Sequence, residues 1–505
     1  MKNRLYIYIA LMFQFVLADF QNSCIVSNNR TYRQSYINPE SIESENFVIH
    51  FTTADDDFQN INGELYSLQS SFEFAQSILD LIEPTLDKYI EDGWELPPPD
   101  CDESIDDVNS PNHCNNFGGN ALYDIYISND GVGMVVPESA YEVEPYTGGR
   151  TSFMKMSTML NQYTTLPVWA HHVVAHELHH SIQLRYGYSV SGGPGNYMYN
   201  GWLFEQTATY MENVIFPDSF HLRTMLANCD VVTPITYPEY GINYPAEIYP
   251  YRSALWQKFL VESQGDSTII RNIWEGYGEE YATGNLVDLF PIYDNAIRSV
   301  TDNNYDLDNA YKDYAIWRYF TGDRSISNNY FNESSYYCES TSFILDDALE
   351  NTFSNSISNK GGASYIQLPL YDINIKLSTP NPEHIRVSYL SVDLNNNVIS
   401  QDLEINNMDE FFDFDAQNLL SHTILVYPSY INSLDNISFD VSVVDYINGD
   451  INFDQVLNIL DVVIIVNFAL EETFPTDLEL QIADMNVDGV INILDVVQLI
   501  NQILD

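Results

Sequence analysis

The sequence predicts a multidomain protein with an α+β domain first, an all-β sandwich-like domain next and a small α module at the end. Three observations support this order. Strand patterns precede a His-rich helix, short alternating strands follow residue 360, and an Asp/Asn loop pattern occurs twice near the C-terminus. The chain has 505 residues, of which 45% are apolar, so it is long enough to fill several cores.

The N-terminus has the pattern of an export signal. A positively charged start precedes an apolar run from Leu5 to Leu17, which is too short for a comfortable membrane span. Ala18 then supplies the small residue that a signal peptidase favours. We expect residues 1–18 to be a signal peptide and residues 19–45 to be an N-terminal segment or a propeptide. The mature chain is expected to be secreted or held at the cell surface, with no transmembrane span.

The charge balance limits the classes of partner. Lys and Arg number 19 against 72 Asp and Glu, which gives a formal net charge of −53. Nucleic acids and anionic membranes would repel such a chain, so we expect neither as a partner. Abundant Asp instead favours calcium sites and solubility in a saline medium.

Five cysteines follow the expected signal peptide, and an exported protein keeps cysteines as disulfides. Cys101 and Cys114 could close a short loop, and Cys229 with Cys338 would be the second pair, which leaves Cys24 over. The sequence alone does not fix this connectivity. No Cys-x-x-Cys or Cys/His nucleophile pattern is present, so thiol chemistry is not expected.

The α+β domain begins with strand and helix patterns. Residues 46–52 alternate as a strand, residues 65–91 have helical spacing, and residues 123–128 and 150–157 predict two more strands. We assign residues 151–157 to the sheet edge that borders a cleft. An extended peptide could pair with such an edge.

The central helix carries a metal-ligand pattern. His176, Glu177 and His180 spell H-E-x-x-H, and two His four residues apart lie on one helix face, where both can reach one ion. Glu177 is rotated off that face and can address a water instead of the ion. A His-rich tract could also bind metal loosely or form a polar surface. His172 lies four residues before His176 but lacks a following Glu, so we expect it to support the site or face solvent.

A second helix, residues 202–213, offers the third ligand. Glu205 opens this helix, and Ala208 and Glu212 follow on the same face. His176, His180 and Glu205 would complete a His2Glu set for one catalytic Zn²⁺, with water in the fourth position.

The region after the glutamate helix predicts further helices at residues 249–261, 269–277 and 309–320, rich in Trp and Tyr. Aromatic stripes at helical spacing usually form core. Tyr251 is a candidate to donate a hydrogen bond to a tetrahedral intermediate, with core packing or cleft lining as the alternative.

Residues 46–355 resemble a family of secreted bacterial metalloproteases of the gluzincin class, first labelled after a myxobacterial protein. The resemblance rests on F-V-I-H-F-T, Y-D-I-Y-I, V-A-H-E-x-x-H-x-I-Q, W-x-x-E-x-x-A-x-x-x-E and Y-x-x-A-L-W-x-x-F-L. It implies a zincin-like domain in which His176, His180 and Glu205 bind zinc and Glu177 is the general base. Thermolysin-like enzymes place an Asp where this chain has Thr209, so Glu212 is the candidate partner of the ligands.

Residues 360–446 predict the sandwich-like domain, in which no catalytic pattern is visible. Short alternating or β-branched runs are separated by Asn, Asp and Pro turns. The expected strands are residues 365–368, 373–378, 385–392, 423–427 and 437–444.

The C-terminal residues 449–505 contain two copies of one loop pattern, each followed by an apolar helix. Asp, Asn, Asp, Asn and Asp occupy positions 1, 3, 5, 9 and 12, the spacing with which EF-hand loops bind calcium. We therefore expect two Ca²⁺ sites. The first would use Asp450, Asn452, Asp454, Asn458 and Asp461, and the second Asp484, Asn486, Asp488, Asn492 and Asp495.

This module resembles a type I dockerin, a duplicated calcium-dependent docking domain whose partner is a cohesin. Gln455 stands where the second loop keeps Gly489, so the resemblance implies a weaker first site. The pairs Ile459-Leu460 and Ile493-Leu494 are apolar at positions that often include hydroxyl residues in cellulosomal dockerins. The two pairs offer near-identical faces for a cohesin-like or cell-surface protein partner, with a hydrophobic contact to the rest of the chain as the alternative.

Together these patterns predict a secreted zinc metalloendopeptidase that hydrolyses protein or peptide substrates with a metal-activated water and Glu177 as base. The alternative is a non-catalytic extracellular binding or scaffold protein with structural zinc and calcium. An open coordination position beside Glu177 favours hydrolysis, whereas Glu177 in a buried ion pair favours the scaffold.

Overall fold

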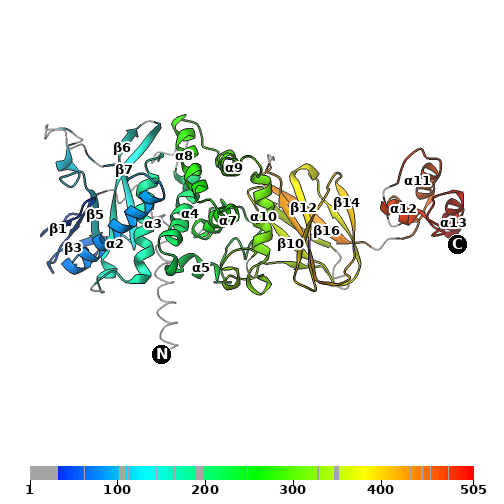
Figure 1. Ribbon diagram of the computed structural model, residues 1–505, viewed down its shortest axis with the longest axis horizontal. Helices are drawn as coiled ribbons and strands as arrows, with labels where there is room; N and C mark the ends of the chain where they lie inside the picture. The colour runs from blue at the N-terminus through cyan, green and yellow to red at the C-terminus, as the bar shows by residue number, and fades with distance from the viewer. Residues whose placement is uncertain are drawn as a thin grey trace, which may run out of the picture. The chain divides into compact units, whose positions relative to one another are not determined.

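The computed structural model shows a mixed α and β, multidomain protein (Figure 1). The predicted signal peptide and Cys24 lie outside the residues that it describes. The described residues are 32–61, 63–99, 101, 110, 113–143, 145–162, 165–188, 197–246, 248–326, 329–345, 352–430, 434–444, 447–454, 456–475 and 477–504. The chain separates into two compact units, Met1–Thr341 with Ile357–Ser364 and Tyr427–Asn436, and Ser342–Ser356 with Tyr365–Val426 and Ile437–Asp505.

The first unit contains a five-stranded sheet in the order β1 (Glu40–Glu43), β2 (Phe47–Phe51), β5 (Tyr123–Ser128), β7 (Tyr146–Ser157) and β6 (Gly133–Val143). Strands β2, β5 and β7 run parallel, while β1 and β6 pair antiparallel at the two edges. Every residue of β5 is buried, as expected of a parallel strand covered on both faces. The three strands predicted for this part of the chain are confirmed.

The edge position predicted for residues 151–157 is wrong, because their strand, β7, pairs with both β5 and β6. Strand β6 lies at the edge instead. Its sequence contains Pro137, and the register slips between Pro137 and Ala140, which marks a β-bulge. Proline in a sheet is confined to edges and bulges. Pro137 therefore suits the edge position of β6, although it disfavours a strand prediction from the sequence.

The described part of the predicted N-terminal segment, from residue 32 onward, belongs to this sheet. Strand β1 pairs with β2 in register. Arg33 forms ion pairs with Asp124 of β5 and with Glu138 of β6, the latter at 2.7 Å between Nη2 and Oε2. These contacts fix the segment to one sheet face.

The helix predicted at residues 65–91 begins later than expected. Residues Glu64–Ser67 form β4, which pairs with β3 (Phe58–Ile61) as a hairpin. Helix α2 spans Phe72–Glu91, and its N-cap Ser71 accepts a hydrogen bond from the backbone N–H of Phe74 at 3.1 Å. The Ser cap satisfies an amide that the helix itself cannot, so it marks where the helix begins.

Three helices form the support of the candidate site. Helix α3 (His171–Gln183) contacts β6 and β7, and it also packs against α2 and α4 (Tyr197–Ile215) (Figure 1). The buried Tyr89 of α2 donates a hydrogen bond from its hydroxyl to the carbonyl oxygen of Ala175 in α3 at 2.8 Å. Helix α3 is therefore enclosed on several sides.

Further helices, rich in aromatic residues, complete the first unit. Trp256 and Trp274 are fully buried, so the predicted aromatic core is confirmed. These helices are α5 (His221–Leu226), α6 (Tyr249–Arg252), α7 (Ala254–Gln264), α8 (Thr268–Ala282), α9 (Leu289–Val300) and α10 (Leu307–Tyr319). Short 3-10 helices are η1 (Cys114–Asn116), η2 (Thr158–Gln162), η3 (Val168–Ala170), η4 (Pro217–Ser219), η5 (Gly322–Arg324), η6 (Ser334–Tyr336) and, in the second unit, η7 (Pro382–His384).

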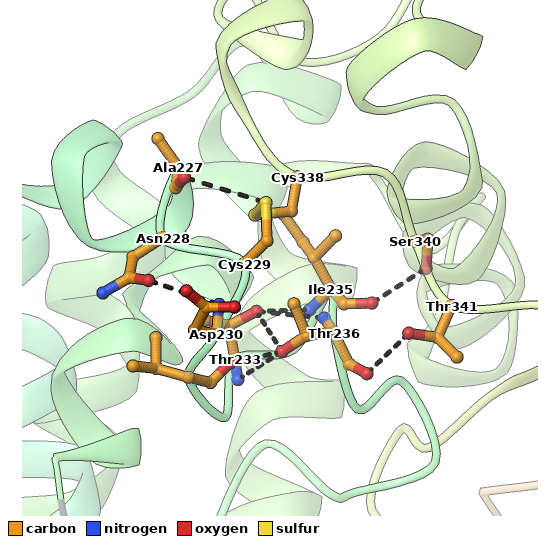
Figure 2. The surroundings of a disulfide bond; sticks show 11 residues. Ala227, Asn228, Cys229, Asp230, Thr233, Ile235, Thr236, Cys338, Ser340 and Thr341 are labelled. Atoms are coloured by element: carbon orange, nitrogen blue, oxygen red, sulfur yellow. Dashed lines mark hydrogen bonds between the residues drawn. A yellow bond between two sulfur atoms is a disulfide. The ribbon is translucent and has the colours of Figure 1, made fainter.

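Two disulfides join the cysteine pairs that the sequence suggested, Cys101 with Cys114 and Cys229 with Cys338. Figure 2 shows the second, which links the segment after α5 to the segment after α10. Next to it, the Thr341 hydroxyl donates to the carbonyl oxygen of Thr236 at 2.8 Å. This part of the chain is thereby held against the segment that follows α5.

The second unit contains two β-sheets and a small helical module. The strands are β8 (Phe343–Ile344), β9 (Thr352–Ser358), β10 (Ser364–Gln367), β11 (Ile373–Ser378), β12 (Ile385–Asp393), β13 (Val398–Leu403), β14 (Asp409–Phe414), β15 (Leu419–Pro428) and β16 (Asn436–Val443). One sheet has the order β13-β12-β15-β10-β8 and the other the order β14-β11-β16-β9. Along β11, buried residues alternate with partly exposed ones.

The C-terminal module consists of α11 (Ile459–Ala469), α12 (Asp477–Ala483) and α13 (Ile493–Leu504). Its core is small and includes Ile465 and Leu499, both fully buried. In the part of the chain that the structure describes, no helix is long and apolar enough to span a bilayer.

Candidate metal centre

The H-E-x-x-H helix and the glutamate helix bring the three predicted zinc ligands together. His176 and His180 lie on α3, Glu205 lies on α4, and all three side chains are buried. The Nε2 atoms of both imidazoles are 3.2 Å from Oε2 of Glu205. Two ligands of a tetrahedral zinc ion at its usual bond lengths stand about 3.3 Å apart, so the observed spacing fits this ion.

The second nitrogen of each imidazole has its own partner. His176 donates from Nδ1 to Oε1 of Glu212 at 2.6 Å, because an ionised carboxylate can only accept. His180 Nδ1 lies 2.7 Å from Oε1 of Gln183, whose amide nitrogen donates to the carbonyl oxygen of Phe204 at 3.0 Å. Both Nε2 lone pairs are therefore left facing Glu205, the arrangement of an imidazole ready to bind metal.

The charges of the cluster suit a cation. Burial lowers the pKa of His180, and the neighbouring Glu205 offsets that effect only in part. Burial alone would raise the pKa of Glu205, but His180 and His176 outweigh it and hold the pKa of that carboxyl well below its ordinary value. Neutral imidazole and ionised carboxylate are the forms that ligate metals.

Glu177 follows His176 on α3 and lies against the edge strand. It is buried, and its side chain packs on Gly133 of β6. A Cβ atom at Gly133 would lie 2.7 Å from Cγ1 of Val173 and 2.9 Å from Cγ of Glu177. Only glycine lets the edge strand pass this close to α3. No sequence pattern marks Gly133 as part of the site, because close approach is a tertiary property.

The two further candidates occupy defined places. Glu212 contacts His176 as described, so it occupies the place of the partner residue that the sequence suggested. Thr209 is buried, and within the described residues its hydroxyl has no hydrogen-bond partner. Tyr251 on α6 stacks its ring on His176, with centroids 5.5 Å apart and planes 9° from parallel. Its ring therefore covers one face of a ligand imidazole.

A second group of metal-binding side chains adjoins the first. Among the described residues, His172, Glu212 and His221 also place one possible ligand atom each within 4.8 Å of one another. Burial, with the neighbouring His221, lowers the pKa of His172 to about 3. His172 was expected to support the site or face solvent. His221 was not predicted, because it follows α4 after a 3-10 turn and belongs to no local motif.

The C-terminal loops share one hydrogen-bond pattern. In the first, Asp461 Oδ2 accepts from the backbone N–H of Asn458 at 2.9 Å, and in the second Asp495 Oδ2 accepts from that of Asn492 at 2.8 Å. The position-12 carboxylates are both buried. Gly489 has a φ of +82°, a conformation that favours glycine at the sharp turn.

Comparison with known families addresses this module directly. Residues 448–504 match the dockerin type I domain. The C-terminal module is a type I dockerin domain. Dockerin domains bind calcium, imply a cohesin partner and are typical of extracellular, cellulosome-type proteins. The predicted resemblance of the module is therefore confirmed.

The region that contains the candidate centre matches a different family. Residues 141–283, which include α3 and α4, match a family of unknown function, DUF6055. That match names no activity, so the predicted resemblance to gluzincin metalloproteases stays a prediction. No curated protein matches the chain.

The similar solved structures include the pre-peptidase C-terminal domain of a collagenase from Bacillus anthracis. It is 14% identical, and the match covers 21% of this chain and 100% of that one, with a TM-score of 0.16. A TM-score this low supports no conclusion about fold or function.

Proposed function

We propose that the chain is a secreted zinc-dependent endopeptidase with a calcium-dependent docking module. The observation that carries this proposal is the convergence of His176, His180 and Glu205, with Glu177 directly after His176 on α3. Bound zinc would polarise a scissile carbonyl and lower the pKa of water.

The side chains of the site then divide the work of peptide hydrolysis. Glu177 takes the proton of the attacking water and returns it to the leaving amine, a general acid–base role. Glu212 and Gln183 hold the two ligand imidazoles in orientation through Nδ1. Tyr251 is the candidate donor to the tetrahedral intermediate, since its ring already stacks on His176.

The substrate is a protein or peptide that binds in extended form. Strand β6 is the last strand of its sheet, and Gly133 at its start packs on Glu177. A peptide that pairs with this edge would pass close to the base. This observation supports an endopeptidase, because an edge strand binds a chain without requiring its terminus.

The docking module is proposed to act separately from the catalytic centre. Its loops would bind two Ca²⁺ through the ten Asp and Asn side chains predicted from the sequence. The exposed pairs Ile459-Leu460 and Ile493-Leu494 would contact a cohesin-like partner. That partner would place the peptidase on a larger extracellular assembly.

Replacement of the base tests the proposal. In the zinc-loaded full chain, Glu177→Gln should lower the rate of casein cleavage by roughly 10²–10⁴-fold while zinc content stays the same. Glu73→Gln, an exposed residue of α2, is the matched control and should cleave at the wild-type rate. Wild-type cleavage by Glu177→Gln would contradict the assignment. Zinc binding without any cleavage by the wild-type chain would favour the scaffold alternative.

A further inference from the structure

A second set of metal-ligating side chains lies beside the candidate centre, and only Glu212 of this set takes part in the proposed hydrolysis, as the partner of His176. His172 precedes His176 by one turn of α3, Glu212 lies two turns beyond Glu205 on α4, and His221 is the first residue of α5. Their ligand atoms all lie within 4.8 Å of one another. Three helices therefore meet at this group.

The group is held together by direct contacts. His221 Nδ1 lies 2.5 Å from Oε2 of Glu212, whose other oxygen accepts from His176. The rings of His172 and His221 stack with centroids 4.1 Å apart and planes 28° from parallel. His172 and His221 thus bring two imidazoles to the carboxylate of Glu212.

The backbone before His221 is constrained. Phe220 has a φ of +52°, which is unusual for a bulky residue, and the guanidinium carbon of Arg223 lies 3.6 Å from its ring centroid. At the far end of α5, the backbone N–H of Cys338 donates to the carbonyl oxygen of Leu226 at 3.1 Å. The Cys229–Cys338 disulfide follows directly (Figure 2). The helix that presents His221 is fixed at both ends.

We propose that His172, Glu212 and His221 form a second divalent metal site that adjoins the first through Glu212. Its two imidazoles and one carboxylate are the donor set that suits zinc and related transition ions. The His221 side chain is 32% exposed, so solvent can supply the fourth ligand. Binding through Nδ1 requires only that the His221 proton move to Nε2, the other neutral tautomer.

The second ion would join α3, α4 and α5 at one point. It would also share Glu212 with the imidazole of His176, so the two sites are neighbours in one chain of contacts. This proposal concerns metal content alone. It does not depend on whether the first site hydrolyses peptides, and the Glu177→Gln experiment leaves it untouched.

Zinc stoichiometry of the untagged full chain tests the proposal. The protein is loaded with zinc in excess calcium, which occupies the dockerin loops, and is then dialysed and analysed for both metals. The expected result is two zinc ions per chain for the wild type, and one for His172→Ala and for His221→Ala. His171→Ala, which removes a neighbouring imidazole outside the group, is the matched control and should keep two.

One zinc ion per wild-type chain would overturn the proposal and leave His172 and His221 as hydrogen-bonding or stacking support for the first site. Two zinc ions in both alanine variants would overturn it as well, since the second ion would then lie elsewhere. The wild-type measurement does not depend on the folding of any variant. The Asn variants at the two positions repeat the test if an alanine variant fails to fold.

Discussion

The candidate centre on α3 and α4 gathers buried ligands from separate helices, whereas each C-terminal loop carries its expected ligands within a single stretch of chain. His176, His180 and Glu205 are enclosed by a large aromatic core. Asn452, Asp454 and their equivalents lie near the surface of a module with few buried residues. The folded core positions the ligands of the first site. In the C-terminal module, by contrast, ion binding must help to stabilise the fold.

This difference has a physical basis. A domain of fewer than about 70 residues rarely buries enough apolar surface to be stable without metals or disulfides. The dockerin match spans residues 448–504 and contains no cysteine. The first unit has two disulfides and fully buried Trp and Tyr side chains. Metal removal should therefore affect the two regions very differently.

Calcium removal is expected to have the largest effect. Excess chelator should unfold the dockerin module, because its loops carry carboxylates that repel one another without the cation. Hydrogen exchange of the full chain would show full exchange in residues 459–504 and unchanged protection in α3. Magnesium at the same concentration should restore protection poorly. Protection that persists in the dockerin module after chelation would show that its fold does not depend on calcium.

Removal of the glycine contact is the next largest effect. Gly133→Ala should displace Glu177, since the new methyl group would lie 2.9 Å from its Cγ. A misplacement of about 1 Å can lower a catalysed rate by roughly 10²-fold. The measurement is the casein cleavage rate beside zinc content, which should stay unchanged. Gly284→Ala is the control variant and should cleave at the wild-type rate, because a Cβ there meets nothing within 4 Å, although its φ of +75° adds some strain.

A change in the support of His180 should have a smaller effect. Gln183→Leu removes the acceptor at Nδ1 and should weaken zinc binding by roughly 10- to 100-fold, as measured by competition with a chelating dye. Thr209→Val removes a buried hydroxyl that has no hydrogen-bond partner in the described structure, and it should leave zinc affinity unchanged. Equal affinities for Gln183→Leu and the wild type would show that the orientation of His180 does not depend on this contact.

The sequence predicted the parts of the two regions that depend on local spacing. His176 and His180 share a helix face, and the dockerin ligands follow one another within each loop, so periodicity was sufficient. Glu205 could be predicted because a second helical pattern, at residues 202–213, includes it. The dockerin assignment is confirmed by its family match.

Features that depend on packing could not be predicted. His221 meets Glu212 only because the chain turns sharply at Phe220. Strand β6 was missed because Pro137 reads as a turn, although it lies at a bulged edge. The role of Gly133 requires knowledge of which helix crosses that edge. In each case the missing information is a tertiary contact.

The most direct test of the central claim is a zinc titration of casein cleavage by the metal-stripped full chain, with calcium held in excess. We expect no cleavage without zinc, and activity that rises in proportion to occupancy of His176, His180 and Glu205. We expect no such rise in His180→Ala. Cleavage by the stripped chain at the rate of the loaded chain would contradict zinc-dependent peptide hydrolysis, and so would a fully loaded chain that cleaves nothing.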